Sequence, residues 1–505
     1  MATREFRRDL LTTLLPGFEG PDAPGWVLDR LRAGLGGVCL FASNVASPAQ
    51  LRGLVRALRA AGPDAVVAVD EEGGDVTRLH AATGSPYPGN ALLGRLDDLA
   101  LTERVARAVG DALAEVGVTV TFAPVADVNS NAANPVIGVR SFGADPALAA
   151  RHTAAWVRGV QSAGVAASAK HFPGHGDTAE DSHLALPVVD LPLAELAARE
   201  LRPFAAAIEA GTRTIMTSHV LLPQLDADAP ATLSPRVLSG LLRGELGFDG
   251  VIVTDALDMH GASGVRGIPE AAVLALAAGC DLLCIGMDVS ADTVDAIVAA
   301  CERAVDDGRL TRARVTEAAA RVRALGRSSP PLRRAGGAPS GAPAAEASAG
   351  RRSLEPVSPA ELARGFEVRA GALDVLADAG GVGTVVRVDS APNIAVGGVP
   401  WGPFAVPAGY RSWWPVAQGV RVAADRPLPD PRSLRGPILV IGKDLHRHDV
   451  ARSAIDALRA GRDDVVVCDL GWPGDDRAYA DVATFGASRV VGEALIGLID
   501  DVLVR

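Results

Sequence analysis

Short apolar runs rich in β-branched residues alternate with longer segments whose apolar residues recur every three to four positions, from the start of the chain to about residue 326. The short runs predict buried strands and the longer segments predict amphipathic helices. Strands are predicted at residues 38–42, 65–70, 118–128, 164–172, 214–220, 251–257 and 281–287. Continuous apolar strands that alternate with helices indicate a parallel sheet with both faces covered.

Residues at the ends of the predicted helices support this interpretation. Helical spacing over 193–211 predicts a single helix in that segment. Another helix is expected over 235–246, because Ser234 can cap its first turn, Pro235 suits that turn and Gly247 follows its end.

The strand–helix units predict a TIM-type (β/α)8-like barrel over residues 1–327, with an open doubly wound sheet as the alternative. The positions of the polar residues favour the barrel, because each one comes at or just after the end of a different strand. These residues are Asp70, Asp127, Lys170 with His171, His219 and Asp255. In a TIM barrel the carboxyl ends of the strands converge on one face, where active sites are built.

The composition changes after the barrel. Residues 328–350 have no period and are rich in Pro, Gly, Ala and Ser, which predicts a linker. Residues 351–505 are predicted to form a smaller α/β open-sheet domain, an αβα sandwich. Its strands are expected at 384–390, 437–445 and 464–471, and its helices at 454–461 and 492–503.

Charge and composition exclude several classes of protein. The net charge of -11 provides no basic surface for a nucleic acid. No apolar run approaches the ~20 residues of a membrane span, and the first residues have no signal-peptide core. The five cysteines are scattered through apolar runs, which predicts buried free thiols in a reducing compartment. We therefore expect a cytoplasmic protein that acts on a small molecule.

The stretch KHFPGHGDTAEDSH, residues 170–183, concentrates the candidate chemistry. Pro173 and Gly174 separate His171 from His175, so these two histidines do not share a helix as metal ligands. Metal-dependent barrel hydrolases also need a His-x-His after an early strand, and LFASN at the first predicted strand provides none. We expect neither a metal nor another cofactor.

Proton transfer suits this stretch better. Asp181 and His183 lie two residues apart, so both side chains project to the same side of an extended loop. The carboxylate can then fix the tautomer of the imidazole and leave its other nitrogen to exchange a proton. A capping aspartate beside an exposed loop histidine is the alternative. Asp255, at the end of VIVTD, is the candidate nucleophile for an anomeric carbon, and Asp258 is its competitor.

Further polar residues are candidates for holding a sugar. Asp70 can bind two hydroxyls or cap a helix, and charged donors come from Arg78, Arg140 and Lys170. Of the 49 basic residues only two are lysines, Lys170 and Lys443, so a lysine in the polar cluster is notable. His171 and His219 are expected to line the same pocket, and His175 to stabilise the loop.

These motifs resemble glycoside hydrolase family 3, in its two-domain β-N-acetylglucosaminidase branch. KHFPGHGDTAEDSHLALP is similar to the signature of that branch, VDEEGGDVTRL to its VDQEGGRVQRL element, NPVIGVRSFG to its arginine element and VIVTDALDM to its nucleophile strand. The similarity continues in LHRHDV and GWPGDDRAYADVATFGASRV of the second domain.

The resemblance implies a retaining exo-β-N-acetylglucosaminidase that cleaves terminal β-linked N-acetylglucosamine, commonly in recycling of peptidoglycan fragments and without a metal. Asp255 corresponds to the nucleophile, and His183, supported by Asp181, to the general acid/base. The positions that hold the N-acetylglucosamine match Asp70, Arg78, Arg140, Lys170 and His171.

Two departures and two alternatives remain. Glu71 and Asp75 replace Gln and Arg of the resembled element, which adds negative charge and leaves chitin oligosaccharides open as substrates beside peptidoglycan fragments. A histidine acid/base does not repel phosphate as a carboxylate would, so inorganic phosphate can replace water and make the enzyme a phosphorylase. A sugar-binding barrel without activity is the remaining alternative, although a binding protein needs no nucleophile.

Overall fold

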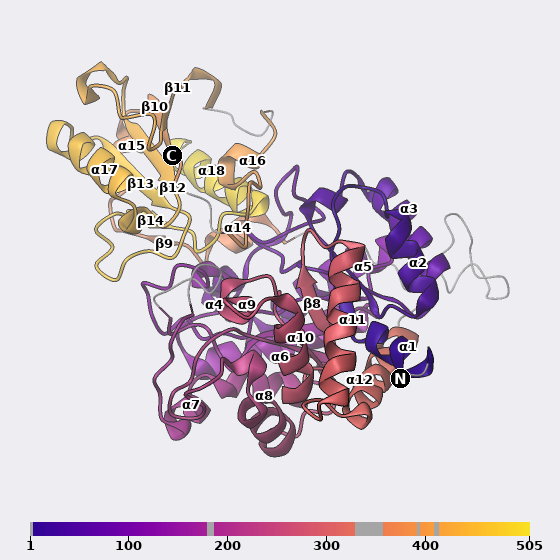
Figure 1. The fold of residues 1–505 in the computed structure, drawn as a ribbon. Coiled ribbons are helices and arrows are strands. Elements are labelled where there is room, and N and C mark those ends of the chain that lie inside the picture. Colours follow the sequence, from indigo (N-terminus) through magenta and orange to yellow (C-terminus); the bar gives the residue numbers. More distant parts are fainter. Residues whose placement is uncertain (1–3, 179–185, 329–356, 391–393, 409–413, 505) are drawn as a thin grey trace. The chain divides into compact units, whose positions relative to one another are not determined.

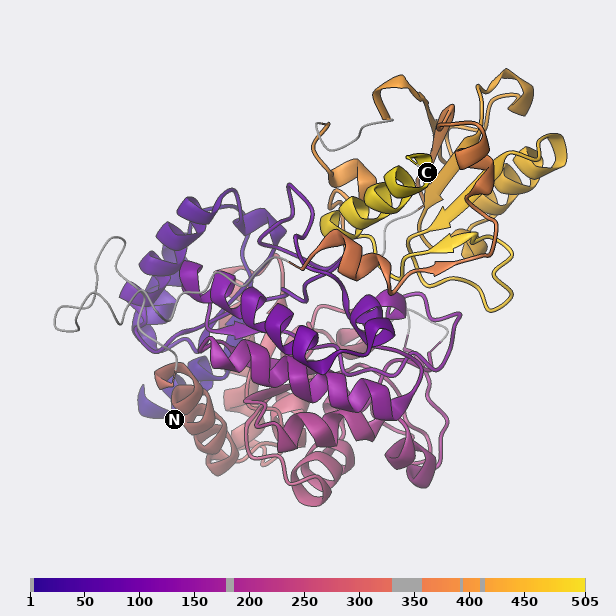
Figure 2. The same cartoon turned by 180° about the vertical axis from the view of Figure 1, so that it is seen from behind.

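The computed structural model describes residues 4–178, 186–328, 357–390, 394–408 and 414–504, in two compact units (Figures 1 and 2). The first unit comprises residues 1–72, 99–128 and 145–356, and the second comprises 73–98, 129–144 and 357–505. Two segments from the first 150 residues therefore belong to the unit that the C-terminal part builds. The predicted linker, apart from Ser328, lies outside the described residues.

The described part of the first unit contains eight parallel strands. They are β1 Leu14–Pro16, β2 Gly37–Leu40, β3 Val66–Val69, β4 Val120–Thr121, β5 Ala166–Phe172, β6 Thr214–Thr217, β7 Val251–Val253 and β8 Leu283–Gly286. Strands β2 to β7 form one curled sheet in chain order, and β1 pairs with β8. A bridge between Val253 and Leu282 joins β7 to β8. The predicted TIM-type barrel is confirmed, and β1 is the strand that the pattern did not predict.

Helices cover the outside of this curled sheet. They are α1 Arg4–Thr12, α2 Gly25–Ala33, α3 Pro48–Ala61, α5 Leu99–Val116, α6 Pro146–Ser162, α7 Leu193–Ala198, α8 Leu201–Glu209, the π-helix η4 Arg236–Glu245, α9 His260–Ser263, α10 Ile268–Ala278, α11 Ala291–Asp306 and α12 Arg312–Arg327. Short 3-10 turns are η1 Ala42–Asn44 and η3 Ala231–Leu233. The inside of the sheet is a packed core of small and branched side chains, such as Val66, Ala68, Val120 and Ala166.

Two helix predictions can be compared directly with the structure. Ser234 accepts a hydrogen bond from Val237 N at 3.3 Å, so the predicted cap is confirmed, although the helix that follows has wide π-turns. The single helix predicted over 193–211 is wrong, because α7 ends at Ala198 and α8 begins at Leu201. Pro203 explains the break: its nitrogen has no hydrogen to donate to the preceding turn.

The second unit is an α/β sandwich with a mixed sheet in the order β11-β10-β12-β13-β14-β9, in which only β9 is antiparallel. Its strands are β9 Glu367–Val368, β10 Thr384–Val388, β11 Gln418–Val422, β12 Ile438–Gly442, β13 Val465–Asp469 and β14 Val482–Ala483. Its helices and 3-10 turns are α4 Asn90–Leu96, η2 Gly138–Arg140, α14 Pro359–Ala363, α15 Asp374–Asp378, α16 Gly402–Ala405, η6 Trp414–Val416, η7 Pro431–Ser433, η8 Leu445–Arg447, α17 Asp449–Gly461 and α18 Arg489–Leu503.

Successive strand residues of this unit pack on opposite faces of the sheet, as the two-residue period of a strand requires. Leu439 and Ile441 of β12 lie in the cluster that contains α14, α15 and α18 residues. Ile438 and Val440 lie in the cluster that contains α17 residues. Helices therefore cover both faces, and the predicted αβα sandwich is confirmed.

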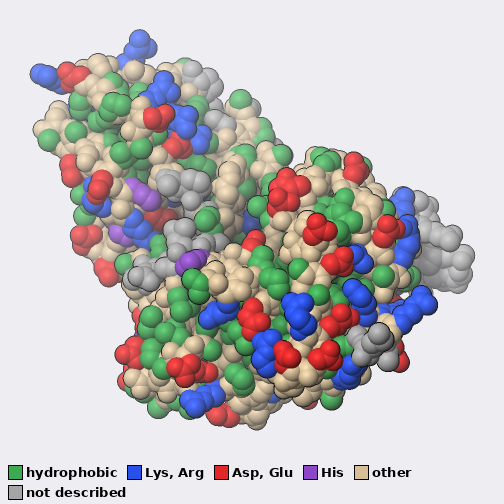
Figure 3. Space-filling model, in the orientation of Figure 1, with side chains coloured by type: hydrophobic (Ala, Val, Ile, Leu, Met, Phe, Trp, Pro, Cys, Tyr) green, Lys and Arg blue, Asp and Glu red, His purple; other side chains and the backbone are tan. Residues whose placement is uncertain are grey.

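The cysteines, the hydropathy of the helices and the surface charges bear on the remaining expectations from the sequence. All five cysteines are buried and none forms a disulfide, which confirms the prediction of free thiols. Among the described residues, no helix is long and apolar enough to cross a membrane. On the face that Figure 3 shows, acidic and basic side chains are interspersed with apolar ones.

Candidate active site

Polar side chains of the first unit lie at the ends of five neighbouring strands, β3 to β7, and hydrogen bonds join several of them in pairs. Asp70 follows β3, Asp127 follows β4, Lys170 and His171 lie in β5, His219 follows β6 and Asp255 follows β7. Because these strands are parallel neighbours in one sheet, their carboxyl ends lie along one edge. Three contacts hold the polar residues at this edge: Lys170 with Asp70, His171 with Asp127, and His219 with the peptide after Asp255.

Lys170 forms ion pairs with two carboxylates. Its Nζ lies 2.6 Å from Asp70 Oδ1 and 2.7 Å from Glu72 Oε1. The side chains of Lys170 and Glu72 are 2% and 3% exposed, whereas that of Asp70 is 22% exposed. Burial of the ammonium is tolerable only because it is paired twice. The arrangement fixes the Asp70 carboxylate and leaves this residue as the most accessible member of the group.

Asp127 holds the turn that follows β5. Its Oδ2 lies 2.7 Å from His171 Nδ1, and its Oδ1 accepts the backbone N–H of His175 at 2.8 Å and of His171 at 3.2 Å. A carboxylate only accepts hydrogen bonds, so His171 carries a proton on Nδ1 and donates it to Asp127. The carboxylate thereby sets both the tautomer and the direction of the imidazole.

His175 is buried below this turn. Its Nδ1 bonds the Thr178 hydroxyl at 2.8 Å, and burial lowers the pKa of His175 to about 4. The ring is therefore neutral at physiological pH. The structure is consistent with the expected stabilising role of His175 in the loop.

His219 supports the segment that carries Asp255. Its Nε2 donates to the carbonyl oxygen of Ala256 at 3.0 Å, and its Nδ1 bonds the Thr232 hydroxyl at 2.9 Å. Asp255 is partly exposed, and its Oδ1 accepts the backbone N–H of Ala256 at 2.8 Å. Both ring nitrogens of the fully buried His219 thus contact protein, and the ring fixes the peptide next to the candidate nucleophile.

A buried carboxyl group lies under the β5 loop, at the break between α7 and α8. Glu200 is 0% exposed, and its Oε1 accepts a hydrogen bond from Arg199 Nε at 2.7 Å. Arg199 also donates to Asp177 Oδ2 at 2.5 Å. Burial is the main cause that raises the pKa of Glu200 to about 7. A Cβ on Gly174 would lie 2.7 Å from Glu200 Oε2, so only glycine fits against this carboxyl.

Four predicted site residues are not among the described residues of the first unit. Asp181 and His183, the predicted acid/base pair, lie outside the described residues. Arg78 and Arg140 belong to the second unit. Arg78 donates to the carbonyl of Ala395 at 2.9 Å. Arg140 is 6% exposed and ends the 3-10 turn η2, where its guanidinium donates to the carbonyl of Val136 at 3.2 Å.

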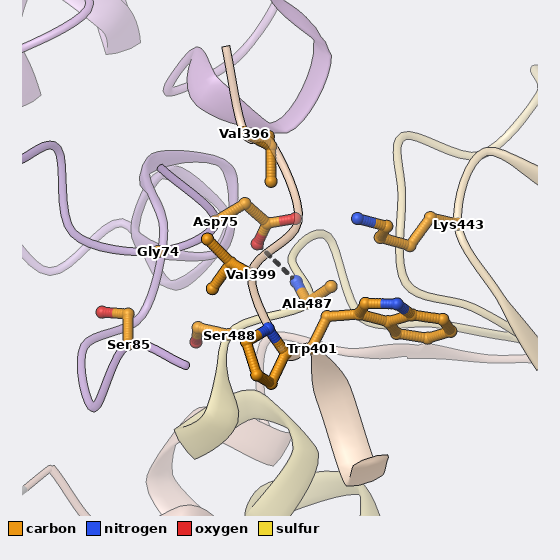
Figure 4. A pocket seen from close by; sticks show the side chains of 10 residues that line it. Gly74, Asp75, Ser85, Val396, Val399, Trp401, Lys443, Ala487 and Ser488 are labelled. Carbon is orange, nitrogen blue, oxygen red and sulfur yellow. Dashed lines mark hydrogen bonds between the residues drawn. The ribbon is translucent and has the colours of Figure 1, made fainter. Parts of the chain in front are cut away.

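Glu71 and Asp75, which replace Gln and Arg of the VDQEGGRVQRL element, have different surroundings. Glu71 is 1% exposed, so its charge is not presented to solvent. Asp75 belongs to the second unit, where its Oδ1 accepts the backbone N–H of Ala487 at 2.7 Å. The negative charge of Asp75 therefore has a structural partner just before α18 (Figure 4).

Asp75 also lines a small pocket of the second unit, where Figure 4 shows it pointing toward Lys443. The walls are formed by Gly74, Asp75, Ser85, Val396, Val399, Pro400, Trp401, Lys443, Ala487 and Ser488. Lys443 Nζ lies 5.4 Å from the Trp401 ring centroid, a cation–π distance. A cavity volume of about 10 Å³ holds one water molecule at most. None of the strand-end residues of the barrel lines this pocket.

The sequence does not assign a role to two residues that orient this site, Glu72 and Asp127. The ion pair of Glu72 with Lys170 has no local signal, because the two residues are far apart in the sequence. Asp127 was noted only as a strand-end residue, and its position in PVADVN after a β-rich run was the available signal. Among the described residues, no three His, Cys, Asp or Glu side chains are grouped as metal ligands.

This arrangement has the components of sugar chemistry. Asp70 offers an accessible carboxylate oriented by a lysine, which suits a pair of sugar hydroxyls. His171 is an oriented imidazole, and Asp255 is a carboxylate at the same edge of the sheet. A carboxylate in that position can attack an anomeric carbon, provided that another group protonates the leaving oxygen.

Comparisons with known proteins place these features in context. The sequence pattern of the Glycosyl hydrolase family 3 N terminal domain matches residues 28–325. Beta-hexosaminidase of Stenotrophomonas maltophilia is 40% identical over 278 residues, which cover 54% of this chain and 82% of that protein. Beta-hexosaminidase A of Pseudoalteromonas piscicida is 40% identical over 273 residues, and the chain spans only 46% of its length.

A solved structure resembles nearly the whole chain. It is a glycoside hydrolase family 3 beta-N-acetylglucosaminidase from Paenibacillus sp. str. FPU-7, with a TM-score of 0.83 and 29% sequence identity. The match covers 98% of this chain and 96% of the other one, so it includes both units.

Proposed function

The chain belongs to glycosyl hydrolase family 3, and we propose that it is a retaining exo-β-N-acetylglucosaminidase. Its substrates would be chitin- or peptidoglycan-derived oligosaccharides with a terminal β-linked N-acetylglucosamine. The proposal is supported by the relatives named beta-hexosaminidase and by the overall similarity to a family 3 beta-N-acetylglucosaminidase.

In the proposed mechanism, Asp255 attacks the anomeric carbon and forms a glycosyl ester. His183, assisted by Asp181, protonates the departing oxygen and then removes a proton from the incoming water. Asp70, oriented by Lys170, binds sugar hydroxyls, and His171, oriented by Asp127, binds beside it. Arg78 and Arg140 complete the group that holds the N-acetylglucosamine. His219 acts by fixing the peptide that follows Asp255.

The observation that carries the proposal is the row of polar residues at the ends of β3 to β7, which three separate contacts orient. Lys170 pairs with Asp70, His171 pairs with Asp127, and His219 bonds Ala256 next to Asp255. A sugar-binding barrel would need the hydroxyl-binding groups of this row. It would not need Asp255, a partly exposed carboxylate whose following peptide is hydrogen-bonded by His219 from the neighbouring strand.

The test is turnover of 4-nitrophenyl N-acetyl-β-glucosaminide, with and without phosphate, and with the sugar product identified in each case. Free N-acetylglucosamine, released first as the β-anomer in proton NMR, is expected at similar rates in both buffers. Release of the 1-phosphate, with a rate that rises with phosphate, would instead identify a phosphorylase. An α-anomer as the first product would contradict the retaining mechanism.

Asp255→Asn is expected to lower kcat by about a thousandfold or more, because the covalent step loses its nucleophile. Asp258→Asn is the matched control, since it removes an exposed carboxylate three residues along the same segment. Similar activity in the two variants would refute the assignment of Asp255.

A further inference from the structure

The second unit contains both arginines that are proposed to hold the sugar, although their positions in the sequence lie within the barrel half. Residues 73–98, with Arg78, and residues 129–144, with Arg140, group with residues 357–505 by contact. Residues after 390 form hydrogen bonds with both of these segments.

The segment that carries Arg140 is held by the turn after β12. The Arg447 guanidinium donates to the carbonyls of Ala132 and Asn134, the latter at 2.5 Å. The Asn134 side chain, fully buried, accepts the backbone N–H groups of Val136 at 2.9 Å and Ile137 at 2.8 Å, which lead directly into η2. Arg447 therefore fixes the start of the turn that ends in Arg140.

The turn that provides Arg447 is itself firmly held. Asp469, at the end of β13 and 0% exposed, accepts the backbone N–H of Asp444 at 2.8 Å and of Leu445 at 3.2 Å. Asp444 in turn accepts the backbone N–H of Trp472 at 2.9 Å. Trp472 and Val139 pack against the same apolar cluster, which contains Phe485.

The segment that carries Arg78 is held in a similar way. Asp75 accepts the N–H of Ala487, the carbonyl of Ser85 accepts the N–H of Arg489 at 3.0 Å, and Arg78 donates to the carbonyl of Ala395. These bonds all join residues before 90 to residues after 390, and Figure 4 shows the first of them. The C-terminal part thus anchors both arginine segments through specific polar contacts.

We propose that Arg447 is a positioning residue that acts through Arg140, by holding the segment of the second unit that carries this arginine. The proposal rests on the proposed function, because only the resemblance assigns Arg140 to the sugar. Loss of the Arg447 bonds would free residues 132–134 and let η2 shift, while the chemistry of the barrel residues stays intact.

The test is a double-mutant cycle with Arg447→Gln and Arg140→Lys, in the full chain. Arg447→Gln is expected to lower kcat/KM by about tenfold to a hundredfold, the range that a small misplacement of a binding group produces. In the Arg140→Lys background it should cause little further loss, because residues that act as a unit are not additive. Arg447→Lys should restore part of the activity.

Arg462→Gln is the matched control. Arg462 also donates to two backbone carbonyls of the same unit, those of Leu434 and Gly436, but these lie outside both arginine segments. Amide hydrogen exchange of residues 129–144 gives a readout that needs no activity. It should be faster in Arg447→Gln than in Arg462→Gln or the wild type.

The outcomes separate the two proposals. A wild-type protein without turnover would refute the proposed function, whereas the exchange measurement would still test the anchoring. Equal kcat/KM in Arg447→Gln and Arg462→Gln would overturn the role of Arg447, provided that Arg140→Lys is impaired. Fully additive losses, or an Arg140→Lys variant with normal kcat/KM, would overturn the claim that Arg447 acts through Arg140.

Discussion

Replacement of Asp127 by Asn tests how the sugar site is organised. The carboxylate accepts three hydrogen bonds, from His171 Nδ1 at 2.7 Å, His175 N at 2.8 Å and His171 N at 3.2 Å. Asparagine keeps the shape and one acceptor oxygen, which can serve the two backbone N–H groups. Its NH₂ then faces His171 Nδ1, so two donors meet unless the imidazole changes its tautomer.

The expected loss of activity in Asp127→Asn follows from the hydrogen bond between Asp127 and His171 Nδ1. A hydrogen bond to a charged group contributes about 1.5–3 kcal/mol, and each 1.4 kcal/mol in a barrier is about tenfold in rate. If His171 binds the sugar throughout the reaction, Asp127→Asn should lower kcat/KM by about tenfold to a hundredfold. The free energy of unfolding should fall by about 1–3 kcal/mol, because the buried network loses its charge.

The assay is steady-state hydrolysis of 4-nitrophenyl N-acetyl-β-glucosaminide together with urea unfolding. Asp145→Asn is the control: Asp145 also accepts two backbone N–H groups, at the exposed N-terminus of α6, and asparagine caps helices equally well. Asp145→Asn should match the wild type in both assays. If Asp127→Asn also kept kcat/KM within about twofold, the orienting role of the carboxylate would be refuted.

Further predictions concern stability. Lys170→Met removes the buried ammonium that pairs with the buried Glu72 and the partly exposed Asp70, and should lower the free energy of unfolding by about 3–5 kcal/mol. Lys443→Met removes a cation–π contact with Trp401, worth about 0.5–1 kcal/mol. Equal losses in urea unfolding would contradict the burial argument. Burial raises the pKa of Glu200 from 4.5 to about 7. Between these two pH values the folded protein keeps a proton on Glu200 that the unfolded chain has lost. Wild-type stability should therefore fall by about 3 kcal/mol as the pH rises through this range. The stability of Glu200→Gln relative to the wild type should rise by the same amount, and a pH-independent difference would exclude this linkage. Gly176→Ala places a Cβ 1.7 Å from the carbonyl oxygen of Val128 and should lower Tm strongly. Gly53→Ala, in the open on α3, should raise Tm slightly, and a comparable loss there would contradict this reasoning.

Much of the fold could be predicted because its signals are local. Seven of the eight barrel strands were apparent as short β-branched runs, and the three main strands of the second sheet were found in the same way. β1 was missed because its three residues continue the apolar pattern of α1 without a turn residue between them. The break at Arg199 and Glu200 was missed because helical spacing continues through it, although Pro203 indicated it.

The candidate site could be predicted only in part, because some of its contacts join distant segments. The strand-end position of Asp70, Lys170 and Asp255 follows from the local pattern and the barrel topology. The partners of Lys170 do not, since Asp70 is 100 residues away in the chain. Asp75 shows the limit most clearly. The sequence predicts that its charge influences the choice of substrate, whereas in the structure the carboxylate accepts a backbone N–H that is 412 residues distant in the chain.

The interleaving of the two units has a consequence for how the molecule can be divided. A break in the backbone between residues 329 and 356 would yield two pieces, yet the second unit needs residues 73–98 and 129–144 from the first piece. Leu92, for example, is buried in the same apolar cluster as Leu439 and Val491. The two pieces should therefore complement each other as a noncovalent pair, and the C-terminal piece expressed alone should lack part of its own core.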